Sequence, residues 1–319
     1  MTGLDRSIAP IAVAIRSELA ESVHHGVAVA IDAGGRVTAF VGDPGAVIYP
    51  RSALKPLQAS AMVDIGLDVP SEMLALASAS HDGAPDHVEG VRRMLAAFDL
   101  SESDLGNTSA RPYGSAARAR ARAEGTPPSA IQQNCSGKHA AMLATCRVNG
   151  WAIEGYTASC HPVQRAITGA ISELASEVLH VGVDGCGAPT HALRLQDLAA
   201  AIATVTRDRR SPAIAMGEHP ELVGGPTRDV TLAMRAVPGL LVKDGAQGVT
   251  VAAMPDGRAV ALKIADGSDD CRRALTATAL THIGVELSRD LVEALRVPLF
   301  GHGEPVGEIE PLKWTTCVS

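Results

Sequence analysis

The spacing of apolar residues places strands towards both ends of the chain. Residues 26–32 and 36–41 are rich in apolar and β-branched residues and flank Ala33-Gly34-Gly35, which predicts a β-hairpin. Further along, residues 240–242, 248–254 and 258–264 predict three more strands. Because the two groups of strands lie far apart in sequence, we expect one sheet assembled from both.

The middle of the chain has helical spacing. Residues 54–65 carry apolar side chains at helical intervals, with Pro56 in the first turn. Further helices are expected at 73–79, 88–98, 138–148, 163–179, 195–205, 222–237, 269–285 and 289–295. The pattern predicts an α+β fold, in which an antiparallel sheet built from N- and C-terminal strands carries an inserted helical lobe. We expect a single domain over residues 1–319, with the sheet lobe near 22–50 and 239–295 and the helical lobe near 51–238.

Composition narrows the class of protein. The 319 residues are 46% hydrophobic and 20% charged, enough for a large core. A net charge of −7 gives no general attraction to nucleic acid or to an anionic membrane, so neither is expected as a partner. The short basic run Arg118, Arg120 and Arg122 is interpreted as a solvated face, and a phosphate-binding patch is the alternative.

We expect a cytoplasmic protein. Residues 1–21 are interrupted by charges and lack the apolar core of a signal peptide, and no apolar stretch is long enough to span a membrane. The six cysteines are sparse, and in a reducing compartment they are expected to be core residues or ligands instead of disulfides.

A Ser-x-x-Lys motif at Ser52 and Lys55 is the candidate reacting centre. If a helix begins near Ser52, Lys55 follows one turn later on the same face and can reach the serine hydroxyl. A lysine whose pKa is lowered can act as the base that activates a serine. The alternative is an ordinary helix start, with Ser52 as N-cap and Lys55 in solvent.

Three loops in the helical region are rich in reactive side chains. They are Ala79-Ser80-His81-Asp82-Gly83, Asn134-Cys135-Ser136-Gly137-Lys138-His139, and Asp184-Gly185-Cys186-Gly187-Ala188-Pro189-Thr190-His191. Two thiolates from Cys135 and Cys186, with Lys138 and with His139 or His191, suit zinc. The alternative is that both cysteines pack as small apolar residues.

Lys263 stands among apolar residues in the last predicted strand, 258–264. It is either a charge that protects an edge strand from aggregation or a buried lysine with a lowered pKa. In the second case it lies on the sheet behind the Ser52 helix.

Taken together, these motifs resemble the asparaginase II family, the class 3 L-asparaginases, from about residue 22 to residue 267. The motifs that carry the resemblance are Arg51-Ser52-x-x-Lys55-Pro56, Ala79-Ser80-His81, Asn134 to His139, Asp184-Gly185-Cys186-x-x-Pro189-Thr190, His219-Pro220 and Lys263-Ile264-x-Asp266-Gly267. The resemblance implies a fold like that of serine β-lactamases and glutaminases, and hydrolysis of L-asparagine to aspartate and ammonia. One departure lies at Gly187-Ala188, where the family often has an amide and an apolar residue.

The resemblance also implies roles for individual residues. It pairs Ser52 with Lys55 and Ser80 with Lys263, and it implies a metal site at Cys135, Lys138 and Cys186. We expect Arg51, His81, Asn134, His139 and Asp184 to bind substrate or support the site. Any zinc would be structural or modulating and would not generate the nucleophile, and a homodimer is expected.

We therefore expect an L-asparagine amidohydrolase with a lysine-activated serine. Ser52 with Lys55 is favoured as the nucleophile and base, while Ser80 with Lys263 stays open. The alternatives are a glutaminase, another serine amidohydrolase, or a non-catalytic protein of this fold that binds zinc or a small molecule. A β-lactamase is disfavoured because the chain lacks Ser-Asp-Asn and Lys-Thr-Gly.

Overall fold

The computed structural model describes residues 4–317, which form two compact units. The sheet unit comprises the chain up to Ala53, Ala192–Asp208, and the chain from Leu232 onward. The helical unit comprises Leu54–His191 and Arg209–Thr231. This composition confirms the predicted α+β class and the assembly of the sheet from both ends of the chain.

The sheet unit is organised on an antiparallel sheet of nine strands among the described residues. The order is β10-β11-β1-β2-β9-β8-β7, and β3 pairs with both β2 and β12. The strands are β1 (Ala9–Arg16), β2 (Leu19–Ile31), β3 (Val37–Val41), β7 (Leu241–Gly245), β8 (Val249–Ala253), β9 (Ala259–Ile264), β10 (Pro298–Gly301), β11 (Glu304–Pro311) and β12 (Thr315–Thr316). The predicted hairpin and the three later strands are confirmed, whereas β1 and β10 to β12 were not predicted, so the sheet extends beyond 22–50 and 239–295.

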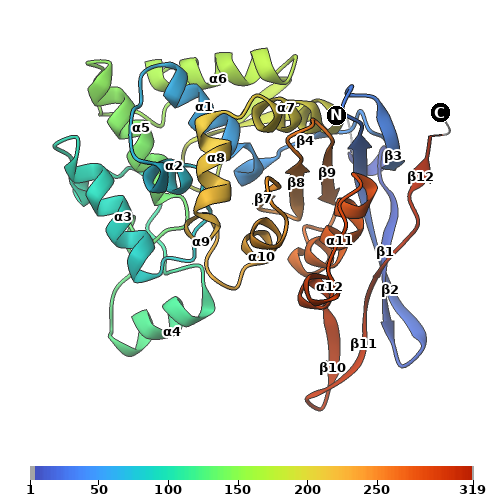
Figure 1. Ribbon diagram of the computed structural model, residues 1–319. Helices are drawn as coiled ribbons and strands as arrows, with labels where there is room; N and C mark the ends of the chain where they lie inside the picture. Colours follow the sequence, from blue (N-terminus) through green and yellow to red (C-terminus); the bar gives the residue numbers. More distant parts are fainter. Residues whose placement is uncertain (1–3, 318–319) are drawn as a thin grey trace. The chain divides into compact units, whose positions relative to one another are not determined.

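Helices cover the part of this sheet formed by β7, β8 and β9, in which every residue is buried. α7 (Leu195–Arg207) packs on β2, β8 and β9, and α11 (Asp269–His282) packs on β8, β9 and β11. Figure 1 shows α11 and α12 (Arg289–Leu295) beside the strands from the C-terminal part of the chain. The sheet unit also contains η1 (Leu4–Arg6) and β4 (Val47–Ile48), and β4 pairs with residues 193 and 194 at the end of β6 (Pro189–Arg194).

The helical unit is built around α5 (Ser136–Val148), in which residues 136–146 are all buried. α5 packs on α1 (Lys55–Asp64), α2 (Ser71–Ala77), α3 (Pro85–Ala96) and α6 (Pro162–Leu174). The unit also holds α4 (Ser115–Ala123), α8 (Ser211–Glu218), α9 (Pro220–Val223), η3 (Glu102–Asp104) and β5 (His180–Val183). η2 (Arg51–Leu54) and α10 (Asp229–Ala236) lie where the chain passes from one unit to the other.

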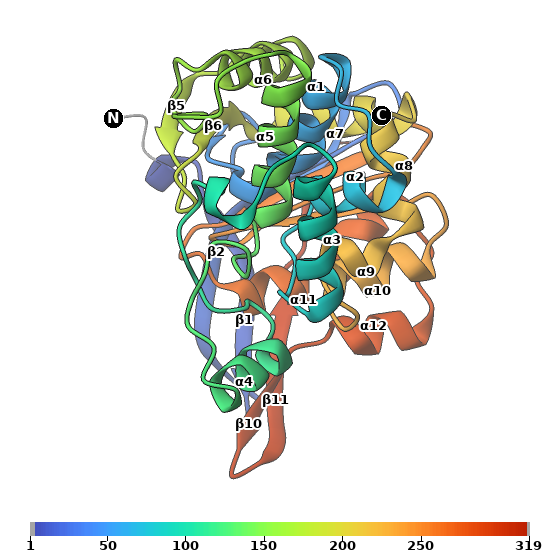
Figure 2. The same cartoon turned by 90° about the vertical axis from the view of Figure 1, so that its left-hand side faces the viewer.

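One predicted helix is divided in the structure, and two helices were not predicted. The helix expected at 222–237 is divided into α9 and α10, because Gly224, Gly225 and Pro226 interrupt it. α4 and α8 were not predicted. α4 lies at the periphery of its unit (Figures 1 and 2), and Ala121 is its only buried residue, which confirms that the arginine run forms a solvated face. Among residues 4–317, no helix is long and apolar enough to cross a membrane.

Gly137 brings the first turn of α5 against the end of α2. A Cβ atom at this position would lie 2.3 Å from the backbone oxygen of Leu76, which is far inside contact distance. The approach matters because residues 134–139 and 79–83, two of the reactive loops, adjoin these two helix ends.

Replacing Gly137 by alanine should therefore lower the free energy of unfolding by about 1–3 kcal/mol, because the added methyl group must displace backbone. Gly169, inside α6, is a matched control, since a Cβ there meets nothing within 4 Å. Gly169→Ala should raise the stability by about 0.5–1 kcal/mol, because alanine loses less backbone entropy in a helix. Denaturant unfolding of both variants measures the difference, and equal effects would show that the close approach is not needed.

Candidate active site

The predicted site residues are divided between the two units. Arg51, Ser52 and Lys263 belong to the sheet unit. The helical unit holds Lys55, Ser80, His81, Asn134, Cys135, Lys138, His139, Asp184 and Cys186. Each group is described within its own unit.

In the helical unit, Lys55 and Ser80 form a buried pair. Lys55 is the first residue of α1 and is 1% exposed, while Ser80 is 2% exposed. The Lys55 Nζ atom lies 3.3 Å from Ser80 Oγ and also donates to the carbonyl of Ala79. The sequence had assigned Lys55 to Ser52 and Ser80 to Lys263. The structure thus joins one member of each predicted pair through a hydrogen bond.

The loop that carries Ser80 is fixed by its backbone. The amide of Ser80 donates to the carbonyl of Val223 at 2.9 Å, and the amide of Asp82 donates to the carbonyl of Gly224 at 2.7 Å. Asp82 Oδ1 accepts from Arg228 Nη1 at 3.3 Å. A short loop tied to a second segment, residues 223–228, by these bonds holds its side chains in place for chemistry.

His81 connects this loop to the start of α5. It is fully buried, and its Nδ1 accepts the amide N–H of Gly83 at 3.1 Å. The proton of the neutral ring is therefore on Nε2, which donates to Ser136 Oγ at 2.9 Å. Burial holds the pKa of His81 well below its ordinary value, and the positive charges of His87 and Lys55 act in the same direction. His81 is thus a neutral structural bridge at pH 7.

Cys135, Lys138 and Cys186 meet in the same unit, as the resemblance implied. They are 5%, 1% and 2% exposed, and Lys138 Nζ lies 3.3 Å from Cys186 Sγ. The two thiol groups hydrogen-bond to each other, and this bond lowers the pKa of Cys135 and raises that of Cys186. Burial opposes the first shift, and the charges of Lys55 and Lys138 favour it. Of the two thiols, Cys135 is thus the one that loses its proton more readily.

Lys138 lies beside these two thiols. Burial by itself would lower its pKa, but its interactions with Cys186, Cys135 and Asp184 raise it overall. Without a metal, Lys138 therefore holds its proton more firmly than a free lysine does. The donor set of two sulfurs and one amine fits a soft metal such as zinc, which binds thiolate and nitrogen ligands, once Lys138 has lost its proton.

Neither histidine completes this set. Among residues 4–317, no three His, Cys, Asp or Glu side chains are arranged to hold a metal ion. The prediction that His139 or His191 joins both cysteines is therefore wrong. Hydrogen bonds orient both rings, since His139 Nδ1 lies 2.8 Å from Tyr156 Oη and His191 Nε2 lies 2.8 Å from Thr168 Oγ1.

Asn134 and Asp184 support the cysteine cluster. Asn134 Oδ1 accepts from Cys135 Sγ at 3.4 Å, and its carbonyl accepts the amide of His81 at 3.2 Å. Asp184 Oδ1 accepts the amide of Gly185 at 2.6 Å. Gly187, where the sequence departs from the family pattern, has φ +90°, a conformation that glycine adopts at no steric cost.

Three supporting residues were not identified from the sequence. Ser136 accepts from His81, Tyr156 contacts His139, and Gln133 Oε1 accepts the amide of Cys135 at 3.0 Å. Ser136 and Gln133 stand within the reactive loop or next to it, so a search of that loop could have found them. Tyr156 carries no such signal, because it lies 17 residues from His139.

In the sheet unit, Ser52 and Arg51 lie in η2. Ser52 is 9% exposed, and Arg51 has φ +54°, an uncommon conformation for a residue with a side chain. A Cβ atom at Gly245 on β7 would lie 2.3 Å from the backbone oxygen of Pro50, so this segment packs tightly against the sheet. The helix expected to begin near Ser52 begins here as a 3-10 turn, and α1 follows from Lys55.

Lys263 lies on β9, between β2 and β8, so the interpretation of Lys263 as an edge-strand charge is wrong. Its Nζ donates to the carbonyls of Gln247 at 2.6 Å and Ile264 at 2.5 Å. Burial lowers the pKa of Lys263, the charge of Arg51 adds to this effect, and Asp266 opposes it. A lysine of this kind is suited to lose its proton.

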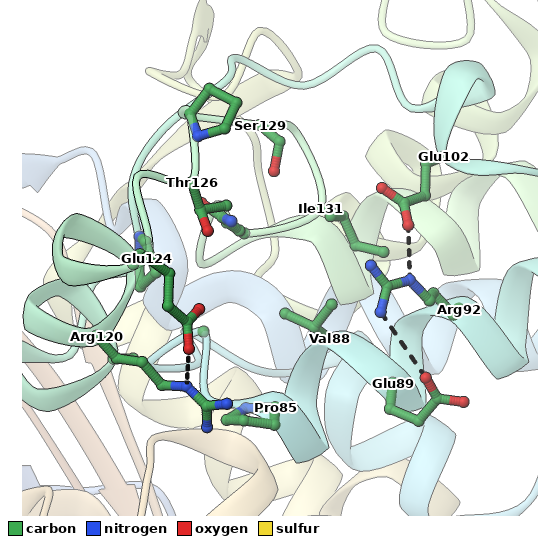
Figure 3. Close-up of a pocket in the computed structure, with 16 residues that line it drawn as sticks. Pro85, Val88, Glu89, Arg92, Glu102, Arg120, Glu124, Thr126, Ser129 and Ile131 are labelled. Carbon is green, nitrogen blue, oxygen red and sulfur yellow. Dashed lines mark hydrogen bonds and ion pairs between the residues drawn. The ribbon is translucent and has the colours of Figure 1, made fainter.

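A pocket of about 470 Å³ in the helical unit reaches Gly83 at the end of the Ser80 loop, and Gln132 also lines it (Figure 3). Its charged side chains already have partners: Arg92 with Glu89 and Glu102, and Arg120 with Glu124. None of the predicted catalytic or metal-binding residues lines it.

Comparison with known proteins places the chain in a family. The sequence profile of L-asparaginase II matches residues 12–311. No match was found among curated protein sequences. Among solved structures, the crystal structure of a β-lactamase from Mycobacterium bovis is similar with a TM-score of 0.42 and 18% identity, covering 82% of this chain and 95% of that one. Because the profile match spans most of its length, the chain belongs to the L-asparaginase II family.

Proposed function

We propose that the protein hydrolyses L-asparagine to L-aspartate and ammonia through a lysine-activated serine. Membership of the L-asparaginase II family implies a hydrolase that acts on amides. The observation that supports the mechanism best is the buried Lys55–Ser80 hydrogen bond. Lysines 55 and 263, when neutral, keep two N–H donors and gain a lone pair that can accept a serine proton.

The proposed reaction has two halves. A neutral lysine takes the hydroxyl proton of the attacking serine, whose oxygen bonds to the side-chain amide carbon of asparagine. The resulting oxyanion is stabilised by backbone N–H groups, the lysine returns the proton to the leaving nitrogen, and ammonia departs. Water then attacks the acyl-enzyme ester, again with a lysine as base, and aspartate is released.

Two serines are candidates for the attack. Ser52 with Lys55 is the pairing that the sequence favours, and the Lys55–Ser80 bond supports a proton relay that includes Ser80. Ser80 can also attack, with Lys55 or Lys263 as its base. The variants described below separate these roles.

The substrate is assigned from the family, and the alternatives are glutamine, another amide, or no turnover at all. Ammonia release from asparagine and from glutamine, run beside nitrocefin hydrolysis followed by colour, distinguishes them. Release from asparagine alone supports the proposal. Zinc or ligand binding with no release from either amide would instead indicate a non-catalytic protein. A cytoplasmic homodimer completes the proposal, on the basis of the sequence and the family resemblance.

We also propose that Cys135, Lys138 and Cys186 bind zinc. The ion would hold the two cysteine-bearing loops together and would supply a fixed positive charge near the site. It has no part in forming the nucleophile.

Replacing either serine should remove activity. Ser52→Ala and Ser80→Ala should each lower kcat by at least about a thousandfold, and the double variant should be no worse, because residues that act as a unit give non-additive losses. Ser60→Ala is the matched control, since Ser60 is buried in α1 and its hydroxyl donates to the carbonyl of Pro56. Mass spectrometry of quenched reactions identifies the acylated serine. Near wild-type turnover in either variant would remove that serine from the mechanism.

Activity should rise with pH and reach an alkaline plateau. The pKa of Lys263 is lowered, so its neutral form appears at a lower pH than for a free lysine, and kcat increases as the proton leaves. Lys263→Arg should be inactive because a guanidinium stays protonated. Lys313→Arg, at the exposed lysine, is the control and should keep the wild-type profile. Substantial activity in folded Lys263→Arg protein would leave Lys55 as the only base.

Zinc content tests the metal proposal. Protein expressed with zinc should hold about one zinc per chain, and Cys135→Ser should lose it. Cys146→Ser is the control, because Cys146 is buried in the same helix and burial raises its pKa to about 11. Elemental analysis that finds no zinc in the wild-type protein would return Cys135 and Cys186 to a packing role.

A further inference from the structure

His139 has one hydrogen-bond partner and one nitrogen without any. The residue lies in α5 with no exposed surface. Its Nδ1 is 2.8 Å from the phenol oxygen of Tyr156, and the two rings meet edge to face with centroids 5.6 Å apart. Its Nε2 is buried and has no partner among the described residues.

The hydrogen bonds of Tyr156 decide where the proton of His139 lies. The backbone N–H of Gly106 donates to Tyr156 Oη at 2.9 Å, so the phenol oxygen already accepts one hydrogen bond. If the phenol O–H donates to His139 Nδ1, the only group without a partner is the Nε2–H of the ring. If Nδ1 carried the proton instead, both the phenol O–H and the Nε2 lone pair would be unpaired. The first arrangement leaves fewer buried groups unsatisfied and is favoured.

Tyr156 itself is held from two sides. Gln164 Nε2 donates to its carbonyl at 2.8 Å, and Gly106 has no side chain to block the ring, since a Cβ there would come within 3.1 Å of it. The phenol therefore has a fixed place and determines both the orientation and the tautomer of His139.

A buried N–H without an acceptor is unfavourable, so a bound ligand that supplies the acceptor is the natural explanation. The ring follows Lys138 directly in α5, and burial lowers the pKa of His139, with the charges of Lys138 and Lys55 adding to this effect. The amino-acid substrate of the proposed reaction carries carboxylate and amide oxygens, all of which are acceptors.

We propose that Tyr156 is a positioning residue that holds His139 as the Nε2–H tautomer, and that this N–H donates to an oxygen of the bound amino-acid substrate. The inference rests on the proposed function and deepens it. It assigns His139 to substrate binding as a donor. It also excludes His139 as a general base and as a metal ligand through Nε2.

The tautomer can be read without any activity measurement. In histidine-labelled protein, ¹⁵N NMR should show His139 protonated at Nε2 only, and addition of L-aspartate should shift the Nε2–H signal as the carboxylate accepts from it. Tyr156→Phe should mix the two tautomers, because the donor to Nδ1 is gone. Tyr113→Phe is the control, since its ring stays over Arg228 and His139 should be unchanged.

Kinetics test the donor role. Tyr156→Phe should lower kcat/KM for asparagine by about 10–100-fold, the loss expected when one binding group is misplaced. His139→Gln can place an amide N–H near the position of Nε2, whereas His139→Asn places it near Nδ1. The glutamine variant should therefore keep at least about tenfold more activity than the asparagine variant.

The outcomes separate the two proposals. Active wild-type protein with the proton on Nδ1, or with His139→Asn as active as His139→Gln, would overturn the inference and leave the reaction standing. Wild-type protein that releases no ammonia, but keeps the Nε2–H tautomer and loses it in Tyr156→Phe, would refute the asparaginase proposal and retain the positioning role of Tyr156.

Discussion

The burial of ammonium groups is the constraint on which the site depends. Four of the five lysines are less than one-tenth exposed: Lys55, Lys138, Lys243 and Lys263. Lys243 contacts the Asp244 carboxylate at 2.6 Å, which fixes its charge. Lys263 instead donates to the carbonyls of Gln247 and Ile264. Lys55 lies beside the carbonyl of Ala79, the hydroxyl of Ser80 and the thiol of Cys135. A neutral amine still has two donors, so Lys263 can lose a proton without leaving either carbonyl unpaired.

The sequence predicted those helices and strands whose residue pattern is contained within the element itself. Helical spacing over ten or more residues identified α1, α3, α5, α7 and α11, and turn residues identified the β2–β3 hairpin. β1 contains Pro10, and β11 carries exposed charges. Both strands are held by pairing, β1 with β2 and β11, and β11 with β1 and β10. α4 was missed because it buries only Ala121, so there is no apolar face to detect. Such elements depend on partners that are distant in sequence.

The candidate site shows the same division between local and distant signals. Its residue types were found because Ser, Lys, Cys and His gather in short loops, and the structure brings Cys135, Lys138 and Cys186 together. The contact between Lys55 and Ser80 joins residues 25 positions apart, and motif spacing cannot show which lysine serves which serine. The glycine at 137 permits that arrangement indirectly, since it lets α5 and α2 approach where the reactive loops begin.

Two buried histidines show how an ordinary hydrogen-bond pattern can indicate a ligand. His81 and His139 each accept a hydrogen bond at Nδ1, from the amide of Gly83 and from the phenol of Tyr156, so both present an Nε2–H. The Nε2–H of His81 donates to Ser136 at 2.9 Å and serves the fold. The Nε2–H of His139 has no acceptor among the described residues, although its ring is equally buried and equally well held. Since folding alone gives no reason to fix a donor that lacks an acceptor, the difference between the two rings favours a substrate oxygen as the missing partner.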